Sequence, residues 1–337
     1  MKFALVHRRF TTNGGTERYL VGLARFLVAA GHEVHVLCNE VRADLRGEAG
    51  VRFVHLPMWR PAKALSLAWS ARSAVAAGGF DAVMGLGRHV GHSVYRAGGG
   101  SHVDYLRRAH PYRRWFSPGD WLDTLLDRAA VRSASICIAN SRLGAAGLRN
   151  DYGAARVEVV YNGVDLERFR PAPAMREAVR RELGASGPVA IFVGNGFARK
   201  GLDVAIEALP AGWSLWVVGG DRPVPASPAV RFLGTQREPE RFLQAADVMI
   251  LPTRYDPFAN VCLEALACGI PALTTSHNGA SEVLPEPWMT CDDVASFHAA
   301  LLRVTPELGG ACRAVAEAFP PERSFQRALD LLVETCA

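Results

Sequence analysis

The sequence predicts a doubly wound α/β protein built as two domains, each with a parallel sheet covered by helices on both faces. Three observations support this prediction. Short β-type runs alternate with helical patterns from end to end. Many of these runs are continuously apolar rather than alternating, as expected for parallel strands that are buried on both faces. The length of 337 residues suggests two domains, at roughly 100–200 residues each.

The β-type runs are distributed over both halves of the chain. Strands are expected at residues 3–7, 34–38, 51–56, 82–84, 93–96, 136–139 and 157–161, and then at 189–193, 215–218, 230–232, 248–251 and 272–275. Helical spacing of apolar residues predicts a helix that ends at Gly31 and another over 202–209. Pro171 and Pro173 interrupt the pattern, so we expect domains over 1–170 and 171–320. A C-terminal helix within 321–337 could cross back to the first domain.

Composition and charge limit the classes of function. Apolar residues make up 49%, which excludes wholesale disorder. The longest uncharged stretch, 265–281, contains Gly, Pro and His and is shorter than a membrane-spanning helix of about 20 residues. The first apolar run is too short for a signal peptide, so a cytoplasmic protein is expected. Seven cysteines without a CxxC pair make disulfides and a zinc site unexpected.

The positive charge is concentrated in the first half of the chain. Residues 1–170 hold 24 basic and 14 acidic residues, whereas residues 171–337 hold 14 basic and 19 acidic residues. A basic half favours an anionic partner, which could be nucleic acid, anionic lipid or a phosphorylated substrate.

Two glycine-containing loops lead from an expected strand into an expected helix. The first holds Gly14 and Gly15, which would allow a ligand to approach the backbone and the helix start, although a tight turn is the alternative. The second begins at Gly194 and ends with Arg199-Lys200-Gly201. Two cations at a helix start oppose the helix dipole, and a diphosphate ligand would resolve that conflict. The alternative is a pair of solvated surface cations.

Two further segments could carry chemistry. Asp256 lies in a loop before a helix expected from near Asn260 to Gly269, and Glu264 lies about one turn inside it, so both carboxylates could face one ligand. The segment from Arg107 to Phe116 interleaves four arginines with aromatic residues, which suits anionic lipid, a phosphorylated acceptor or single-stranded nucleic acid. The alternatives are a solvated helix acid and a basic surface loop.

Five motifs in order now point to one family. Along the chain they are the Gly14-Gly15 loop, Tyr161-Asn162-Gly163-Val164-Asp165, the Gly194 to Gly201 loop, Ala246-Asp247-Val248 and the stretch from Asp256 to Pro271. With these five motifs, the chain resembles the retaining glycosyltransferases of family 4, which have the GT-B fold of two Rossmann-like domains facing each other across a cleft. The Phe-x-Arg-Lys-Gly loop and the basic aromatic segment are most like those of family members that build lipopolysaccharide cores.

The resemblance implies roles for individual residues. Arg199 and Lys200 would hold the donor diphosphate, approached from the other domain by Gly14 and Gly15 and supported by the loop of Gly194. Glu264 would bind the ribose, and Asp256 with the backbone of Phe258, Ala259, Asn260 and Val261 would hold the transferred sugar and its phosphate. Asp256 replaces the family's usual Glu and is one methylene shorter. Near the reacting carbon the resemblance offers His102, with Asp104 second, and a structural histidine is the alternative.

The resemblance also implies a reaction and its partners. A hexose, glucose as first choice, would move with retention from a nucleoside-diphosphate sugar such as UDP-glucose to a saccharide acceptor on lipid. No cofactor or metal is expected, since no Asp-x-Asp occurs. Arg107, Arg108, Arg113, Arg114 and Trp115 would contact the anionic inner face of the plasma membrane, and nucleic acid is not expected. The alternatives are a nucleotide-sugar epimerase of the same fold, and a non-enzymatic nucleic-acid-binding protein.

Overall fold

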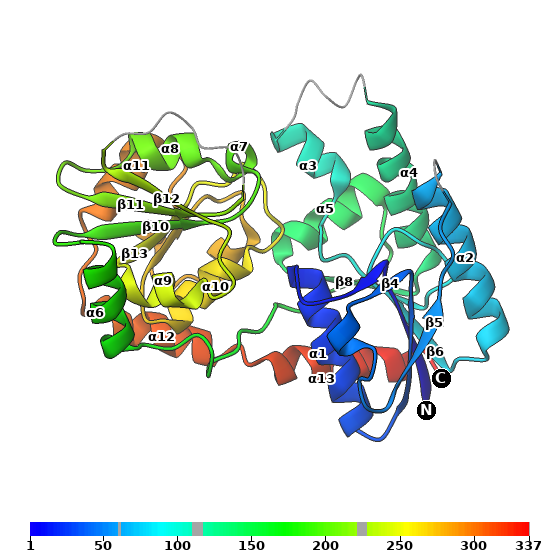
Figure 1. Ribbon diagram of the computed structural model, residues 1–337. Helices are drawn as coiled ribbons and strands as arrows, with labels where there is room; N and C mark the ends of the chain where they lie inside the picture. Colours follow the sequence, from blue (N-terminus) through cyan, green and yellow to red (C-terminus); the bar gives the residue numbers. More distant parts are fainter. Residues whose placement is uncertain (60–61, 110–116, 221–227, 337) are drawn as a thin grey trace. The chain divides into compact units, whose positions relative to one another are not determined.

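Figure 1 shows the computed structural model of the chain, which describes residues 1–59, 62–109, 117–220 and 228–336. The contacts divide the chain into two compact units. The first comprises Met1–Tyr161 together with Pro321–Ala337, and the second comprises Asn162–Pro320.

The first unit is organised around a parallel sheet of seven strands in the order β5-β3-β1-β6-β7-β8-β9. These strands are β1 (Lys2–Val6), β3 (Glu33–Cys38), β5 (Val51–His55), β6 (Ala82–Gly85), β7 (Val94–Arg96), β8 (Ile136–Ala139) and β9 (Val157–Val159). A small parallel pair is formed by β2 (Arg9–Phe10) and β4 (Glu40–Val41). The chain leaves β1 toward β3 and β5 on one side and later continues from β6 to β9 on the other.

Helices cover both faces of this sheet. They are α1 (Gly15–Ala29), α2 (Lys63–Gly78), α3 (His102–Ala109), α4 (Pro118–Ser133), α5 (Arg142–Tyr152) and α13 (Pro321–Glu334), with the short η1 (Ala43–Leu45). Strand β1 shows why its run is continuously apolar. Phe3 and Leu5 belong to the core that includes α1 and α13. Ala4 and Val6 belong to a second core that includes Ala71 of α2.

The last helix, α13, completes the core of the first unit and lies beside α1 (Figure 1). Phe325 packs edge-on against Tyr19, with ring centroids 5.3 Å apart. A Cβ on Gly22 of α1 would lie only 2.5 Å from the Phe325 ring, so the glycine makes room for this contact. The chain therefore leaves the first unit after β9 and returns to it with its last helix.

The second unit contains a parallel sheet of five strands in the order β12-β11-β10-β13-β14. Its strands are β10 (Val189–Val193), β11 (Ser214–Val218), β12 (Val230–Gly234), β13 (Val248–Leu251) and β14 (Ala272–Thr274). Its helices are α6 (Pro173–Glu182), α7 (Phe197–Lys200), α8 (Leu202–Glu207), α9 (Glu240–Ala245), α10 (Asn260–Ala267), α11 (Val294–Leu301) and α12 (Leu308–Glu317). Two short turns, η3 (Gly279–Val283) and η4 (Pro287–Met289), follow β14.

The predicted fold class is confirmed, and each expected run forms a strand within one or two residues of its expected ends. The sequence analysis did not predict the two-residue strands β2 and β4. The second unit begins at Asn162 rather than at residue 171. Its earlier start has a physical reason: Val164 N–H donates to Phe319 O at 2.9 Å, and Phe169 is buried. Among the described residues, no helix is both long and apolar enough to cross a membrane.

Candidate functional site

The sheet of the second unit has a switch point between β10 and β13. From β10 the chain winds to β11 and β12 on one side, and it then crosses to β13 and β14 on the other. In open α/β sheets, ligands bind at the carboxyl ends of the strands at such a point. The loop after β10 carries Arg199 and Lys200, and the loop after β13 carries Asp256. The topology therefore brings together two of the segments that the sequence analysis singled out.

These two loops contact each other through their backbones. Gly201 has φ of +75°, and a Cβ there would lie 2.0 Å from Pro252 O. Arg254 N–H donates to Arg199 O at 2.9 Å. The hydroxyl of Thr253 lies 3.3 Å from the same oxygen. Close backbone contact and two hydrogen bonds thus fix the position of the cations relative to the loop of Asp256.

Both cations bind the Asp256 carboxylate. Lys200 is only 8% exposed, and its Nζ donates to Asp256 Oδ2. Arg199 Nη1 lies 3.3 Å from the same oxygen and donates to Tyr255 O at 3.1 Å. Burial alone would raise the pKa of the Asp256 carboxyl, but Lys200 and then Arg199 outweigh burial and lower it. The neighbouring Gly194 places its Cα beside the aliphatic stem of Lys200.

Helix α10 begins directly after this carboxylate. Phe258 N–H donates to Asp256 Oδ1 at 3.1 Å, and Ala259 N–H donates to Asn278 Oδ1 at 3.0 Å. In the described part of the chain, the structure shows no such acceptor for the N–H groups of Asn260 and Val261. Of the four amides predicted to bind ligand, two therefore already have acceptors within the protein, and the other two lie at the positive end of the helix dipole.

Glu264 lies on α10, four residues after its start, or about 6 Å along the axis. Its side chain is 9% exposed. Arg168 binds Glu240 at 2.8 Å, and the pKa of Arg168 is raised first by that carboxylate and also by Glu264. Glu264 is thus a buried acid near a cation, on the same helix whose start faces Asp256.

Asn278 is a functional residue candidate that the sequence analysis did not find. It is fully buried and accepts hydrogen bonds from Ala259 N–H and Ala280 N–H, while its Nδ2 donates to Thr274 Oγ1 at 2.9 Å. Asp256 N–H donates to His277 O, and Gly279 N–H donates to Asp256 O. The Asn-Gly pair after β14 was the available signal, since such pairs mark turns. Asn278 positions both Asp256 and the beginning of α10.

In the first unit, Gly14 and Gly15 lie at the start of α1. Gly14 has an extended backbone, with φ of −149°, so the turn does not need a glycine for its conformation. A Cβ on Gly14 would lie 2.2 Å from Glu17 Oε2, because this first-turn carboxylate folds over the loop. Glu17 also lies 3.8 Å from His7 Nε2, and this contact with His7 lowers the pKa of Glu17 against the effect of burial. The protein's own carboxylate thus lies beside the predicted anion site.

His102 is the first residue of α3 and is buried. Its Nε2 lies 3.2 Å from Asp120 Oδ1, and Arg88 Nη2 lies 3.3 Å from its Nδ1. Its backbone N–H donates to the hydroxyl of Tyr152. The second choice, Asp104, is also buried and binds Arg107 and Arg108. Both side chains therefore have partners within the first unit.

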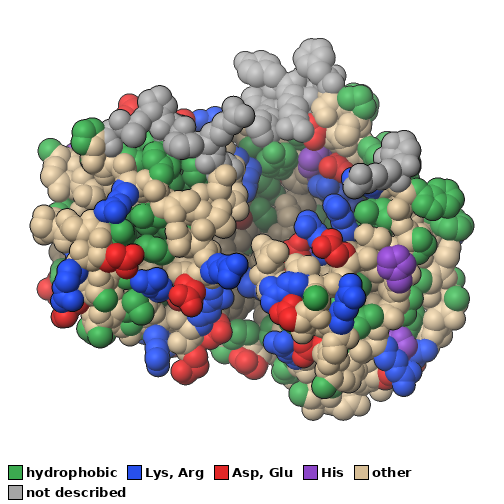
Figure 2. Space-filling view, viewed as in Figure 1, with side chains coloured by type: hydrophobic (Ala, Val, Ile, Leu, Met, Phe, Trp, Pro, Cys, Tyr) green, Lys and Arg blue, Asp and Glu red, His purple; other side chains and the backbone are tan. Residues whose placement is uncertain are grey.

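The positive charge of Arg107 and Arg108 in the basic segment is partly neutralised by nearby carboxylates. Arg107 binds Asp104 at 3.1 Å and Asp151 at 2.9 Å, and Arg108 binds Asp104 at 2.9 Å. The segment 107–116 itself contains no acid, but the preceding helical turn and α5 supply these two. Figure 2 likewise shows basic side chains next to acidic ones on the visible face. Arg113, Arg114 and Trp115 lie outside the described residues.

Within the described ranges, no group of three or more His, Cys, Asp or Glu side chains is arranged to hold a metal ion. Six cysteines are buried and Cys336 is exposed, and all seven are free.

Comparisons with known proteins show a similarity to glycosyltransferases. Residues 13–168 match the family described as Glycosyltransferase Family 4, and residues 187–305 match Glycosyl transferases group 1. A probable transglycosylase of Burkholderia thailandensis is 29% identical over 96% of this chain and 94% of its own length. A D-inositol 3-phosphate glycosyltransferase of Salinispora arenicola is 33% identical, over 45% of this chain and 42% of its own length.

Two solved structures show the same fold over almost the whole chain. WaaG, a glycosyltransferase involved in lipopolysaccharide biosynthesis, superposes with a TM-score of 0.80 at 19% identity, covering 98% of this chain and 99% of its own. Anabaena HepE in complex with UDP and glucose superposes with a TM-score of 0.76 at 19% identity, covering 99% of this chain and 100% of its own. Together the two glycosyltransferase models cover most of the chain, and its two Rossmann-like α/β domains have the fold of GT-B glycosyltransferases.

Proposed function

We propose that the protein transfers a hexose, with retention of configuration, from a nucleoside-diphosphate sugar to a saccharide acceptor on lipid. UDP-glucose is the proposed donor, and the reaction is like that of the lipopolysaccharide core α-1,3-glucosyltransferase I. The observation that carries this proposal is the cluster of Arg199, Lys200 and Asp256 at the switch point of the second sheet. It is supported by HepE, solved with UDP and glucose, and by WaaG, involved in lipopolysaccharide biosynthesis.

The cluster explains how a diphosphate could bind. Both cations bind the same Asp256 oxygen, so an entering diphosphate would offer them more than one anionic oxygen each. Asp256 would then be free to accept hydroxyl protons from the sugar, while the open amides of Asn260 and Val261 face the phosphate. Glu264, one turn further along α10, would accept hydrogen bonds from the ribose.

The same groups would stabilise the departing diphosphate. As the bond to the sugar breaks, negative charge grows on the leaving phosphate, and fixed cations and amides stabilise it most in a water-poor site. We propose front-face attack, in which the leaving phosphate accepts the proton of the acceptor, without cofactor or metal. A trapped covalent sugar adduct, or loss of activity in chelator with recovery in magnesium, would contradict this mechanism.

The proposed location is the inner face of the plasma membrane, with the protein peripherally associated, because a lipid-linked acceptor lies there. Nucleic acid is not a proposed partner, and neither nucleotide-sugar epimerisation nor nucleic-acid binding is favoured by a feature of the described site. Incubation with the donor alone tests the epimerase alternative, since epimerisation would proceed without an acceptor.

Thermal stabilisation by nucleotides tests the donor site directly. A ligand at 100 times its dissociation constant stabilises the folded state by about 2.7 kcal/mol. We expect UDP and UDP-glucose to raise the melting temperature by several degrees, and we expect Lys200→Met to abolish the shift. Arg254→Met is the matched control, because Arg254 lies in the neighbouring loop and its side chain pairs with the exposed Asp203. Absence of any shift across UDP, ADP, GDP and their sugars would refute the proposal.

A further inference from the structure

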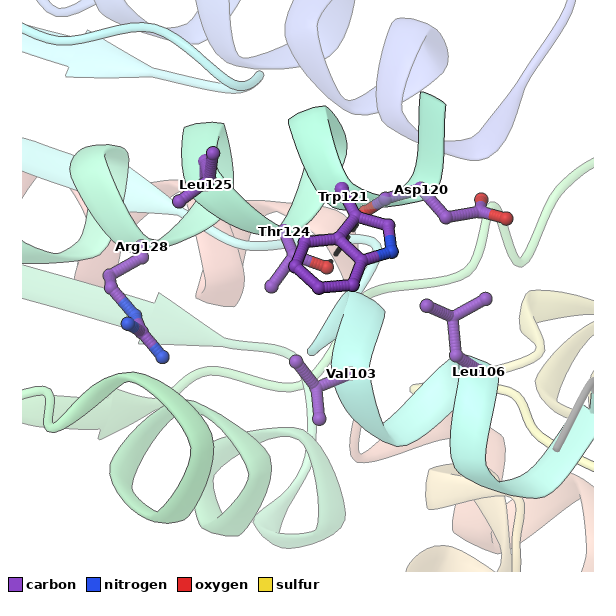
Figure 3. Close-up of a pocket in the computed structure, with 7 residues that line it drawn as sticks. All are labelled: Val103, Leu106, Asp120, Trp121, Thr124, Leu125 and Arg128. Atoms are coloured by element: carbon purple, nitrogen blue, oxygen red, sulfur yellow. Dashed lines mark hydrogen bonds between the residues drawn. The ribbon is translucent and has the colours of Figure 1, made fainter. Parts of the chain in front are cut away.

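A groove of ≈ 310 Å³ lies between α3 and α4 in the first unit (Figure 3). Val103 and Leu106 line it from α3, and Trp121 and Leu125 line it from α4. Trp121 and Leu125 are each 59% exposed. Large apolar side chains that remain exposed around a groove mark an interaction site.

Further apolar residues lie on a neighbouring helix of the same unit. Trp69 of α2 is 66% exposed, and Trp59 just before α2 is 70% exposed. Gly91 lies against Arg72 of α2, and the ring Nε2 of the next residue, His92, donates to Ala130 O of α4 at 2.9 Å. Helices α2 and α4 therefore flank the same loop. Exposed tryptophans are typical of surfaces that meet the interfacial layer of a bilayer.

The groove also contains one basic side chain. Arg128 lies three residues after Leu125 on α4 and lines the groove. Within the described ranges, it forms no ion pair, whereas Arg88, Arg107 and Arg108 all bind carboxylates. Asp120 also lines the groove, but its carboxylate binds His102. The groove thus combines an apolar wall with a cation, which complements an anion that carries an apolar chain.

The polar groups of the groove decide which occupant fits. The hydroxyl of Thr124 donates to Asp120 O at 2.8 Å within α4. The backbone of both walls is helical, so its hydrogen bonds are already made. An extended peptide laid in the groove would find no hydrogen-bond partner for its backbone in either wall, whereas an acyl chain needs none.

We propose that this groove holds one acyl chain of an anionic phospholipid, with Arg128 beside the phosphate. The inference refines the membrane part of the proposed function and rests on it. It assigns bilayer binding to α3 and α4, in addition to the basic segment at 107–116.

The test compares vesicle binding of two leucine variants. Leu125→Asp should weaken binding to phosphatidylglycerol–phosphatidylcholine vesicles by about tenfold or more, since burying a leucine is worth about 1.5–3 kcal/mol. Leu302→Asp is the matched control, because Leu302 is 62% exposed and lies in the second unit. Arg128→Gln should weaken binding about fivefold, against Arg46→Gln as control, given about 1 kcal/mol for each basic residue near anionic lipid.

A second measurement does not depend on how the charged variants fold. Phosphatidylglycerol with a brominated acyl chain should quench tryptophan fluorescence, and Trp121→Phe should remove part of that quenching. Trp213→Phe should leave it unchanged, because Trp213 lies in the second unit. If wild-type protein does not bind anionic vesicles, the proposed membrane location itself is wrong. Two outcomes would overturn the groove proposal alone. In the first, the wild-type protein binds vesicles but both Leu125→Asp and Trp121→Phe behave as wild type. In the second, Leu125→Asp changes only self-association in sedimentation. The UDP-dependent thermal shift, measured on the same variants, reports separately on the donor site.

Discussion

The loops after β1 and β10 occupy the same place in two similar sheets, yet they present different charged groups. Each follows the strand from which the chain winds in both directions, and each leads into a helix. After β1, the carboxylate of Glu17 at the helix start lies against Gly14. After β10, the charged groups are the cations of Arg199 and Lys200, bound by a carboxylate from a neighbouring loop.

This difference separates what topology contributes from what side chains contribute. A parallel sheet places loop amides and helix starts at the switch point whatever the sequence. Whether that place attracts an anion depends on the nearby charges. In the second unit a diphosphate would find one buried and one half-buried cation, whereas in the first unit it would meet a carboxylate. The second loop is therefore the stronger candidate for the anionic part of a donor.

Removing the carboxylate from each loop should affect the two units very differently. Asp256→Asn would leave Lys200 and Arg199 without their anion, and breaking a buried ion pair in this way costs about 3–5 kcal/mol. Glu17→Gln removes only a long contact to His7, so it should cost less than about 1 kcal/mol. Urea unfolding of both variants measures the difference. A UDP concentration well above its dissociation constant should restore part of the stability lost in Asp256→Asn. Equal losses of stability in the two variants would show that the two loops do not differ in this way.

Removing the cations should abolish most of the activity. Arg199→Ala and Lys200→Ala should each lower kcat by about 100–1000-fold, because each removes a group that stabilises charge on the leaving phosphate. Steady-state transfer from UDP-glucose to a lipid-linked acceptor measures this, with Arg254→Ala as the control. A double variant that retained wild-type turnover would show that the second loop does not bind the reacting diphosphate.

Two glycines in these loops should also differ in how much their replacement destabilises the protein. Gly201→Ala should destabilise the protein by about 2 kcal/mol or more, because Gly201 has a positive φ and its Cβ would meet the carbonyl of Pro252. Gly14→Ala should cost much less, since its backbone is extended and the flexible end of Glu17 can move away. Chemical denaturation of the two variants gives the difference. A larger loss for Gly14→Ala would mean that Glu17 is held rigidly over its loop.

The sequence was sufficient to locate the strands and the candidate loops, because both depend on local patterns. Continuous apolar runs mark buried parallel strands, and a glycine followed by a helical pattern marks the loop after them. The spacing of Asp256 and Glu264 also depends on one helix only. These features are therefore determined by residues that are close together in the sequence.

The missing features depend on contacts between residues far apart in sequence. Nothing local to Asn278 shows that its amide accepts from Ala259, nineteen positions earlier. Likewise Asp151, which neutralises Arg107, comes from another helix. The buried pair His89 and His92 was also missed, because two histidines after a short strand are equally common on a surface. Such partners are determined by tertiary packing rather than by spacing.

Mild acid should destabilise the protein through the first unit and not through the second loop. This is the smallest of the expected effects. His89 and His92 lie in the loop after β6, beside the switch point of the first sheet, with ring centroids 5.6 Å apart. Burial lowers the pKa of His89 to about 3 and that of His92 to about 4. Their folded-state pKa values are below the unfolded value of about 6.5, so the unfolded state binds protons first and stability falls as pH drops below that value. The two groups together should cost about 1.4 kcal/mol between pH 7 and pH 6.

The second loop should not contribute in that interval. The pKa of Asp256 is lowered, so its contribution is present above the ordinary Asp value and is lost only at more acid pH. Urea unfolding at pH 7 and pH 6 measures the change, and His89→Gln and His92→Gln should each reduce the slope by about half, whatever their effect on stability at pH 7. If the double variant kept the full slope, other groups would be taking up the protons. The acid sensitivity would then come from groups other than His89 and His92, and the two regions would not differ in their response to pH.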